Sequence, residues 1–264
     1  MNSNLILNGK RAFVGGASQG IGRACAHELA RIGAGVTAAA RDEAALAGLI
    51  EELPTDDGQK HTFLVADFSQ PDELATQVAT LIESQGVHEI VINNTGGPAA
   101  GPLMDATQAD IVDGITKHVL AYQALAKAFV PGMKNNGYGR IINIISTSVI
   151  MPITGLGVSN TTRGAVANWG RTLAGELGPF GITVNNVLPG FTATERLRSL
   201  LSRKAQRQGT TIEEIELQSK SGIPMRRFAD PREIGSVVAF LSSPAASYLS
   251  GVNLPVDGAR TAVQ

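Results

Sequence analysis

The chain has 264 residues, a length that suits one large domain or two small ones. Hydrophobic residues make up 43% of it, so it holds enough apolar material for a sizeable core and does not have a disordered composition. The formal net charge is −1 and the basic residues are mostly scattered, which argues against a nucleic-acid partner.

The sequence shows no targeting or membrane signal. Residues 1–10 lack a basic segment followed by a long apolar stretch, and no run reaches the ~18 apolar residues that a membrane span needs. The single cysteine, Cys25, lies in an apolar stretch of an expected helix and is interpreted as buried packing material. We therefore expect a cytoplasmic protein in a reducing compartment, without a membrane partner.

Short apolar runs alternate with amphipathic stretches along the whole chain. The runs predict strands at 11–15, 35–40, 62–66, 89–93, 140–145, 182–188 and 252–256. Helical periodicity predicts helices at 20–32, 109–135 and 158–178, and around the apolar positions 46–53 and 74–82. A last helix is expected from Asp230, since Pro231 and Glu233 complete a capping pattern. This alternation predicts an α/β fold, one domain over 1–264 with a seven-stranded parallel sheet and helices on both faces.

Residues 191–225 interrupt this alternation. They are polar, charged and weakly patterned, and they stand between the sixth strand and the helix that starts at Asp230. A substrate lid is the interpretation that we prefer for this segment, and a surface insertion is the alternative.

A glycine-rich stretch, residues 15–22, follows the first strand and opens the first helix. Glycines there allow the backbone to approach a pyrophosphate closely, and the N-terminus of the helix supplies N–H groups and partial positive charge. In this strand–turn–helix context the stretch predicts a dinucleotide site. The candidate residues are Gly16, Ser18, Gln19, Gly20, Ile21 and Gly22.

The end of the second strand bears on the choice of cofactor. A nucleotide fold that binds the ribose 2′-hydroxyl usually has an acidic residue there, whereas this chain has Ala40 followed by Arg41. Without an acid there is no repulsion of a 2′-phosphate, and the guanidinium group of Arg41 can pair with that phosphate. We therefore expect NADP(H), with NAD(H) less favoured; the alternative is that Arg41 is only a solvated loop residue.

Further motifs follow in order along the chain. They are Asn93-Asn94-Thr95-Gly96, Pro189-Gly190-Phe191-Thr192-Ala193-Thr194 and Val256-Asp257-Gly258. With them the chain resembles, from Arg11 to Gly258, the classical short-chain dehydrogenase/reductase family, in a divergent ketoacyl-reductase-like branch. The resemblance implies a single-domain, doubly wound Rossmann-type fold. It also implies that the cofactor is held by Asp67, Phe68, Asn93, Gly96, Pro189, Gly190, Thr192 and Thr194.

The resemblance also locates a catalytic set in which three of four positions have changed. The family transfers hydride between a carbonyl compound or alcohol and the nicotinamide, with an Asn-Ser-Tyr-Lys set. The serine is present as Ser146, but Ser159 replaces the tyrosine, Arg163 the lysine and His118 the asparagine. In its family role Arg163 would also hold the nicotinamide ribose.

The chemistry of these changes leaves two hypotheses. A serine hydroxyl is a far weaker acid than tyrosine, whose pKa is ~10, and arginine stays protonated and so does not relay a proton. His118, with a reference pKa of ~6.5, is a candidate acid–base group, and a hydrogen-bonded structural histidine is the alternative.

The first hypothesis is an NADP-dependent oxidoreductase. In it Ser146 and Ser159 polarise the carbonyl, and His118 or water supplies the proton. The second is an NADP-binding protein with little dehydrogenase turnover, acting as a sensor, partner subunit or scaffold. We favour the enzyme, because a retained glycine turn, Ser146 and Thr194 make most sense around a reacting nicotinamide.

The sequence gives weaker indications of metals, substrate and oligomeric state than of the cofactor. The other histidines show no metal-ligand spacing, so no metal is expected. Leucines beside arginines in the 191–225 segment fit an amphiphilic or anionic carbonyl substrate without selecting one. The resemblance implies a homotetramer, with a dimer as the alternative.

Overall fold

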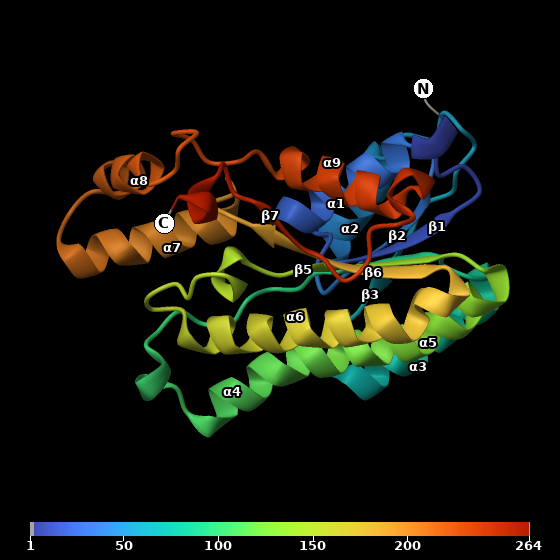
Figure 1. The fold of residues 1–264 in the computed structure, drawn as a ribbon, viewed down its shortest axis with the longest axis horizontal. Helices are drawn as coiled ribbons and strands as arrows, with labels where there is room; N and C mark the ends of the chain where they lie inside the picture. Colours follow the sequence, from blue (N-terminus) through green and yellow to red (C-terminus); the bar gives the residue numbers. More distant parts are fainter. Residues whose placement is uncertain (1–2, 264) are drawn as a thin grey trace.

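Seven parallel strands form a single sheet in the computed structural model, which describes residues 3–263 (Figure 1). The strands are β1 (Arg11–Gly15), β2 (Gly35–Ala40), β3 (Thr62–Val65), β4 (Ile90–Asn93), β5 (Gly139–Ile144), β6 (Ile182–Pro189) and β7 (Asn253–Val256). Their order in the sheet is β3-β2-β1-β4-β5-β6-β7. The predicted fold class is confirmed, and the strands differ from the predicted ones only at their ends. Residues 1, 2 and 264 of the predicted domain lie outside the described residues.

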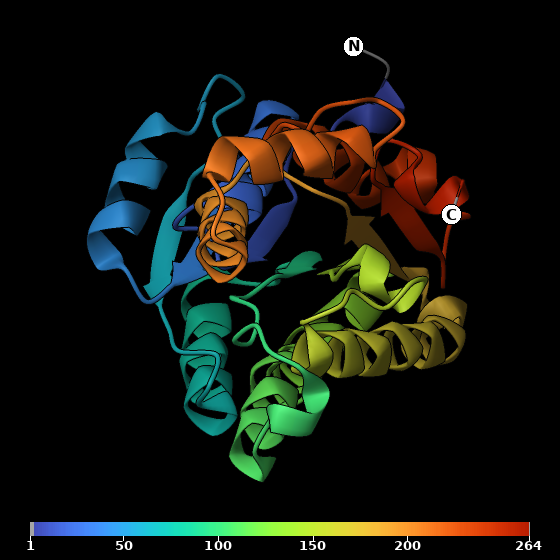
Figure 2. The same ribbon diagram turned by 90° about the vertical axis from the view of Figure 1, so that its left-hand side faces the viewer.

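Helices cover both faces of the sheet (Figures 1 and 2). One face carries α1 (Gly20–Arg31), α2 (Glu43–Glu52) and α9 (Pro231–Ser242), and the other carries α3 (Pro71–Gln85), α4 (Gln108–Ile115), α5 (Ala121–Asn136) and α6 (Gly157–Leu177). Each layer buries its own apolar cluster, with Leu29 and Val238 in the first and Leu125 and Val166 in the second. Across residues 3–263, no helix combines the length and apolarity that crossing a membrane requires.

The order of the strands places a crevice at the carboxyl ends of the strands, between β1 and β4. β2 and β3 are added on one side of β1, whereas β4 to β7 are added on the other side. Because all strands are parallel, the loops after β1 and β4 leave the same edge and then diverge. The helices α7 (Glu195–Gln208) and α8 (Ile212–Ser221) project beyond this edge (Figures 1 and 2).

Side-chain amides join four neighbouring strands inside the sheet. Asn93 Nδ2 donates to Asn143 Oδ1 and Asn143 Nδ2 donates to Asn186 Oδ1, both at 2.8 Å. Asn186 Nδ2 continues the ladder to Asn253 Oδ1, also at 2.8 Å. Since a buried amide left unpaired costs about 1–3 kcal/mol, these bonds favour one register of β4, β5, β6 and β7.

The segment 191–225 is more regular than its weak pattern indicates, because it forms α7 and α8. Thr194 and Thr211 cap the two helices by accepting hydrogen bonds from Leu197 N at 3.3 Å and from Glu214 N at 3.2 Å. Apolar side chains of α7 and α8 then bury one another in a small separate cluster. Its members are Leu197, Leu201, Ala205 and Ile215, with Phe191, Ile212 and Phe228 against them.

The helix expected over 109–135 is divided. Between α4 and α5 lies a π-helical turn, η3 (Thr116–Leu120), which carries His118. π-Helical turns inside α-helices are rare and occur frequently at functional sites. α6 crosses α4 closely, and a Cβ atom at Gly114 would lie 2.8 Å from Thr162 Cγ2. The turn is therefore packed directly against α6, which carries Ser159 and Arg163.

Candidate functional site

The main cleft opens at the edge of the sheet where the strands end. It has a volume of about 910 Å³ and is lined by the glycine-rich turn, by strand ends and by residues of η3, α6 and α7. The predicted site residues in its lining are Gly16, Ser18, Gln19, Gly20, Ile21, Arg41, Asp67, Phe68, Gly96, Ser146, Ser159, Arg163, Pro189, Gly190, Thr192 and Thr194. Gly22, Asn93 and His118 lie behind this lining. Within residues 3–263, no group of three or more His, Cys, Asp or Glu is placed to hold a metal ion.

Glycines and one asparagine shape the turn after β1. Gly16 and Gly20 have φ angles of 58° and 57°, a left-handed conformation that favours glycine. Gly22 supports the turn from behind, since a Cβ atom there would lie 2.2 Å from Gly16 O. Asn94 Nδ2 donates to two carbonyl oxygens of the turn, at 3.0 and 3.4 Å. The N-cap residue of α1, Gln19, makes no side-chain cap hydrogen bond, so its side chain does not use the first N–H groups of the helix, which favour an anion.

Gly15 stands where the family has threonine, and the structure explains the change. A Cβ atom at this position would lie 2.6 Å from Asn94 O and 2.9 Å from Phe68 Cζ. No side chain fits there while the Phe68 ring and the Asn94 backbone keep their places. Gly15 therefore leaves room for the Phe68 ring, and Phe68 lines the cleft.

Charged side chains gather at the ends of β2 and β3. Arg41, Asp67 and Lys117 all line the cleft there. Burial opposes ionisation of Asp67, but hydrogen bonds from Ser69 and the positive charges of Arg41 and Lys117 outweigh it, so the pKa of Asp67 lies below its usual range. Lys117, which no sequence motif indicated, also pairs with Asp113 at 2.7 Å. Arg41 forms no ion pair within the part of the chain that the structure describes, so its guanidinium group is available to a phosphate.

Asn93 does not face the cleft. Its side chain is fully buried and belongs to the asparagine ladder of the sheet. The next residue, Asn94, lines the cleft in its place. The ribose contact expected of the Asn93 side chain is therefore not what this geometry favours, because the amide is committed to the strand next to it.

Two serine hydroxyls are presented to the cleft by well-fixed segments. Ser146 Oγ accepts a hydrogen bond from Ser148 N at 3.0 Å, which uses a lone pair and leaves the hydroxyl proton to be donated elsewhere. Ser159 lines the cleft from the first turns of α6. Its neighbour Asn160 fixes the loop beside it, since Asn160 Nδ2 donates to Ile153 O at 3.0 Å.

Arg163 lies one helical turn beyond Ser159 on α6. It is only 7% exposed, and its Nη1 donates to Ile144 O at 3.1 Å. Burial lowers the pKa of Arg163, but a guanidinium group stays protonated in proteins. The cleft therefore has a fixed positive charge where the family has a lysine that can exchange its proton.

His118 is fully buried and neutral. Its Nδ1 lies 2.8 Å from Gly114 O, and because a carbonyl only accepts, Nδ1 carries the proton and Nε2 presents a lone pair. Nε2 has no hydrogen-bond partner among residues 3–263. Desolvation and the charge of Arg163 lower the pKa of His118 to about 3. This geometry argues against His118 as the direct proton donor at neutral pH.

Tyr122 is a buried polar residue of this region to which the sequence motifs assigned no role. It lies one turn beyond His118, with the two rings edge to face and their centroids 6.1 Å apart. Its hydroxyl faces the Arg163 guanidinium group without a hydrogen bond of normal geometry. Burial raises the pKa of Tyr122, and the charge of Arg163 opposes that rise. The i, i+4 spacing of His118 and Tyr122 was the signal that could have identified it.

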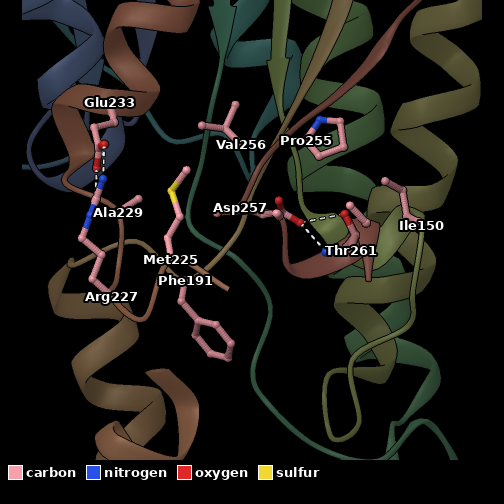
Figure 3. A pocket seen from close by; sticks show the side chains of 13 residues that line it. Ile150, Phe191, Met225, Arg227, Ala229, Glu233, Pro255, Val256, Asp257 and Thr261 are labelled. Carbon is pink, nitrogen blue, oxygen red and sulfur yellow. Dashed lines mark hydrogen bonds and ion pairs between the residues drawn. The ribbon is translucent and has the colours of Figure 1, made fainter. Parts of the chain in front are cut away.

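A second cavity of about 600 Å³ lies beside the main cleft and shares Phe191 with it (Figure 3). Its charged residues have partners within the protein. Arg227 contacts both carboxylate oxygens of Glu233 at 2.6 and 2.7 Å. Asp257 Oδ2 accepts hydrogen bonds from the N–H of Thr261 at 2.8 Å and from its hydroxyl at 2.7 Å. These pairings leave little reason for a charged ligand to bind in the second cavity.

Comparison with known proteins extends over nearly the whole chain. Residues 16–260 match the family model described as Enoyl-(Acyl carrier protein) reductase. The chain is 33% identical over 252 residues to the 3-oxoacyl-[acyl-carrier-protein] reductase of Vibrio harveyi, covering 96% of this chain and 97% of that relative.

Two solved structures are similar over the same extent. One is YwfH, an NADPH-dependent reductase involved in bacilysin biosynthesis, with a TM-score of 0.90, 29% identity and coverage of 95% of this chain and 98% of that one. The other is the L-sorbose reductase of Gluconobacter frateurii in complex with NADPH and L-sorbose. Its TM-score is 0.90 with 28% identity, and 97% of each chain is covered.

Proposed function

The chain belongs to the short-chain dehydrogenase/reductase family, and we propose that it is an NADP-dependent member with an atypical proton relay. The reaction is reduction of a carbonyl compound, or oxidation of an alcohol, by hydride transfer. One observation carries the proposal: the nucleotide turn, two serine hydroxyls and a fixed cation line one cleft. The similar reductases named above support the reaction class.

The residues of the cleft fit NADP(H). The N-terminus of α1 and the glycine turn would hold the pyrophosphate, and Arg41 would pair with the 2′-phosphate. Thr194 would meet the nicotinamide carboxamide while it caps α7. Of the two similar solved reductases, one is NADPH-dependent and the other is in complex with NADPH, which supports NADP(H) as the cofactor. When bound, NADPH supplies the hydride.

Ser146 and Ser159 would hold the substrate oxygen. Their hydroxyl protons would draw electron density from the carbonyl, and Arg163 would stabilise the negative charge that develops on the oxygen. The product alkoxide would take its proton from Ser159, and water would return one to the serine. This route needs no titration of Arg163, which keeps its charge throughout.

His118 and Tyr122 would act from behind Arg163. A neutral His118 adds no positive charge beside the guanidinium group, and its Nε2 lone pair can accept a hydrogen bond. The Tyr122 hydroxyl limits the room in which Arg163 can move. Both residues are therefore proposed to position Arg163 rather than to touch substrate.

Three expectations accompany this function. α7 and α8 would form the substrate lid over the cleft, because Arg196, Leu197 and Leu200 of α7 belong to its lining. A homotetramer, or a dimer, and a cytoplasmic location are also expected. Light scattering on the purified protein measures the oligomeric state directly.

The alternative is an NADP-binding protein with little turnover, which the replaced tyrosine favours. The discriminating experiment follows NADPH absorbance with a panel of 3-oxoacyl thioesters, ketoses and oxo acids. If the chain is an enzyme, we expect it to turn over at least one of these compounds. Tight NADPH binding without turnover of any compound would favour the sensor or scaffold.

A further inference from the structure

Two arginines from different helices flank one glycine of the main cleft. Arg163 comes from α6 and Arg196 from the start of α7, and both line the cleft. A Cβ atom at Gly97 would lie 3.7 Å from Arg163 Nη2 and 3.6 Å from Arg196 Nη2. Because glycine carries no side chain, the space between the two guanidinium groups is open to the cleft.

Backbone carbonyls hold both guanidinium groups in place. Arg196 Nη2 donates to Pro98 O at 2.6 Å, and Arg163 Nη1 donates to Ile144 O at 3.1 Å. Each guanidinium group has five N–H donors, so most of them remain for another partner. The two cations are thus fixed on either side of the same point.

Neither Arg163 nor Arg196 has an acidic partner among the described residues. Within residues 3–263 neither arginine forms an ion pair, although Glu195 also lines the cleft. Burial and the charges of Arg203 and Arg163 together lower the pKa of Arg196. Two like charges that are held together without an acid indicate a place for an anion.

The cofactor has other residues for its own anionic groups. The pyrophosphate is assigned to the N-terminus of α1 and the 2′-phosphate to Arg41, so neither group needs Arg163 or Arg196. The anion between Arg163 and Arg196 therefore belongs to the substrate. Ser159 lies one helical turn from Arg163, so this anion and the reacting oxygen would be only a few bonds apart.

We propose that Arg163 and Arg196 jointly bind a carboxylate of the substrate, which makes the substrate a short oxo acid. A planar carboxylate matches the guanidinium fork and can bridge two of them. This inference rests on the proposed function for its carbonyl, but the carboxylate site can be tested without turnover.

The kinetic test compares acids with their esters. Pyruvate, acetoacetate and levulinate are assayed beside their methyl esters with the natural chain and with Arg196→Met. Loss of a charged hydrogen bond should raise KM for the preferred acid by about 10–100-fold and change KM for its ester by less than about twofold. Arg196→Lys should recover part of the loss. Arg198→Met removes the same charge from an exposed position of α7 outside the cleft lining and should leave KM unchanged.

A binding test separates this inference from the proposed function. Calorimetry measures malonate and its dimethyl ester against the protein saturated with NADP⁺. Malonate binding that is lost in Arg196→Met but kept in Arg198→Met supports the site even if no substrate turns over. Equal effects on acids and esters, weaker NADPH binding in Arg196→Met, or no malonate binding by the natural chain would overturn it.

Discussion

The two sides of the main cleft differ in how their polar groups are satisfied. On the cofactor side, Asn94 holds the glycine turn and Ser69 holds Asp67. On the proton-transfer side, His118 Nε2 and Tyr122 Oη are buried without a hydrogen bond within residues 3–263, and Arg163 has no acid. The glycine turn and Asp67 are thus held by hydrogen bonds of the protein itself, whereas the other side contains a buried cation, Arg163, for which we propose a substrate carboxylate as the partner.

This difference indicates that two of the replacements on the proton-transfer side, Arg163 and His118, depend on one another. The permanent charge of Arg163 helps to keep His118 neutral, and a neutral His118 in turn does not repel Arg163. A lone change at 163 or 118 would alter the charge balance of this buried pair. The variants below test whether the two sides are as separate as this account holds.

The largest effect is expected on the proton-transfer side, from Ser146→Ala. Loss of a hydroxyl that stabilises the developing charge should lower kcat by about 100–1000-fold, with NADPH affinity unchanged. Ser148→Ala is the matched control, because the Ser148 side chain does not line the cleft. Steady-state kinetics and fluorescence titration with NADPH measure both quantities. Equal losses in the two serine variants would contradict the assignment.

On the cofactor side, Arg41→Ala is expected to weaken the binding of the cofactor. Loss of the pair with the 2′-phosphate should weaken NADPH binding by about 10–100-fold and leave NADH binding nearly unchanged. Arg171→Ala, at an exposed position of α6, controls for the change in net charge. If NADPH and NADH lose the same affinity, Arg41 does not select the cofactor.

The separation also explains which features could be predicted from the sequence. Strands and the glycine turn depend on local patterns, so β1, α1 and the Gly16–Gly20 turn follow from residue order alone. The meeting of Arg196 with Arg163 depends on the contact of α7 with the loop after β4, where Arg196 Nη2 donates to Pro98 O, and no local pattern encodes this contact. The buried state of His118 depends likewise on the π-helical turn and on α6 crossing α4.

Even so, α7 carries local signals of a helix in its own sequence. Thr194 and Gly209 bound the helix, and Leu197, Leu201 and Ala205 recur at intervals of four residues. The many charges of this segment obscured that pattern. α7 could therefore be predicted from its own sequence.

A smaller effect is expected from His118→Asn, in the dependence of stability on pH. The pKa of His118 falls from 6.5 to about 3 on folding, so the unfolded chain binds more protons than the folded one in this range. The contribution of His118 to the free energy of unfolding is therefore complete above pH 6.5. It falls toward pH 3, by up to about 1.4 kcal/mol per pH unit. The variant should lose this contribution to the slope, while His88, with a pKa of about 4, retains its own. Urea unfolding at about pH 7, 6 and 5 measures it, and an unchanged slope would contradict a buried neutral His118.

The smallest effect on stability is expected from Tyr122→Phe. Among residues 3–263 the hydroxyl has no hydrogen-bond partner of normal geometry, so its removal should change the free energy of unfolding by less than about 1 kcal/mol. A positioning role predicts that kcat nevertheless falls while NADPH affinity stays the same. Unchanged kinetics would remove Tyr122 from the site.

The central claim is that the replaced set works as a relay of its own. It is tested most directly by steady-state NADPH oxidation with the double variant Ser159→Tyr, Arg163→Lys beside the natural chain, on the same carbonyl panel. We expect turnover by the natural chain and a lower rate in the variant, because a tyrosine and a lysine introduced at these two positions would not suit the buried His118. An inert natural chain and an active double variant would contradict it.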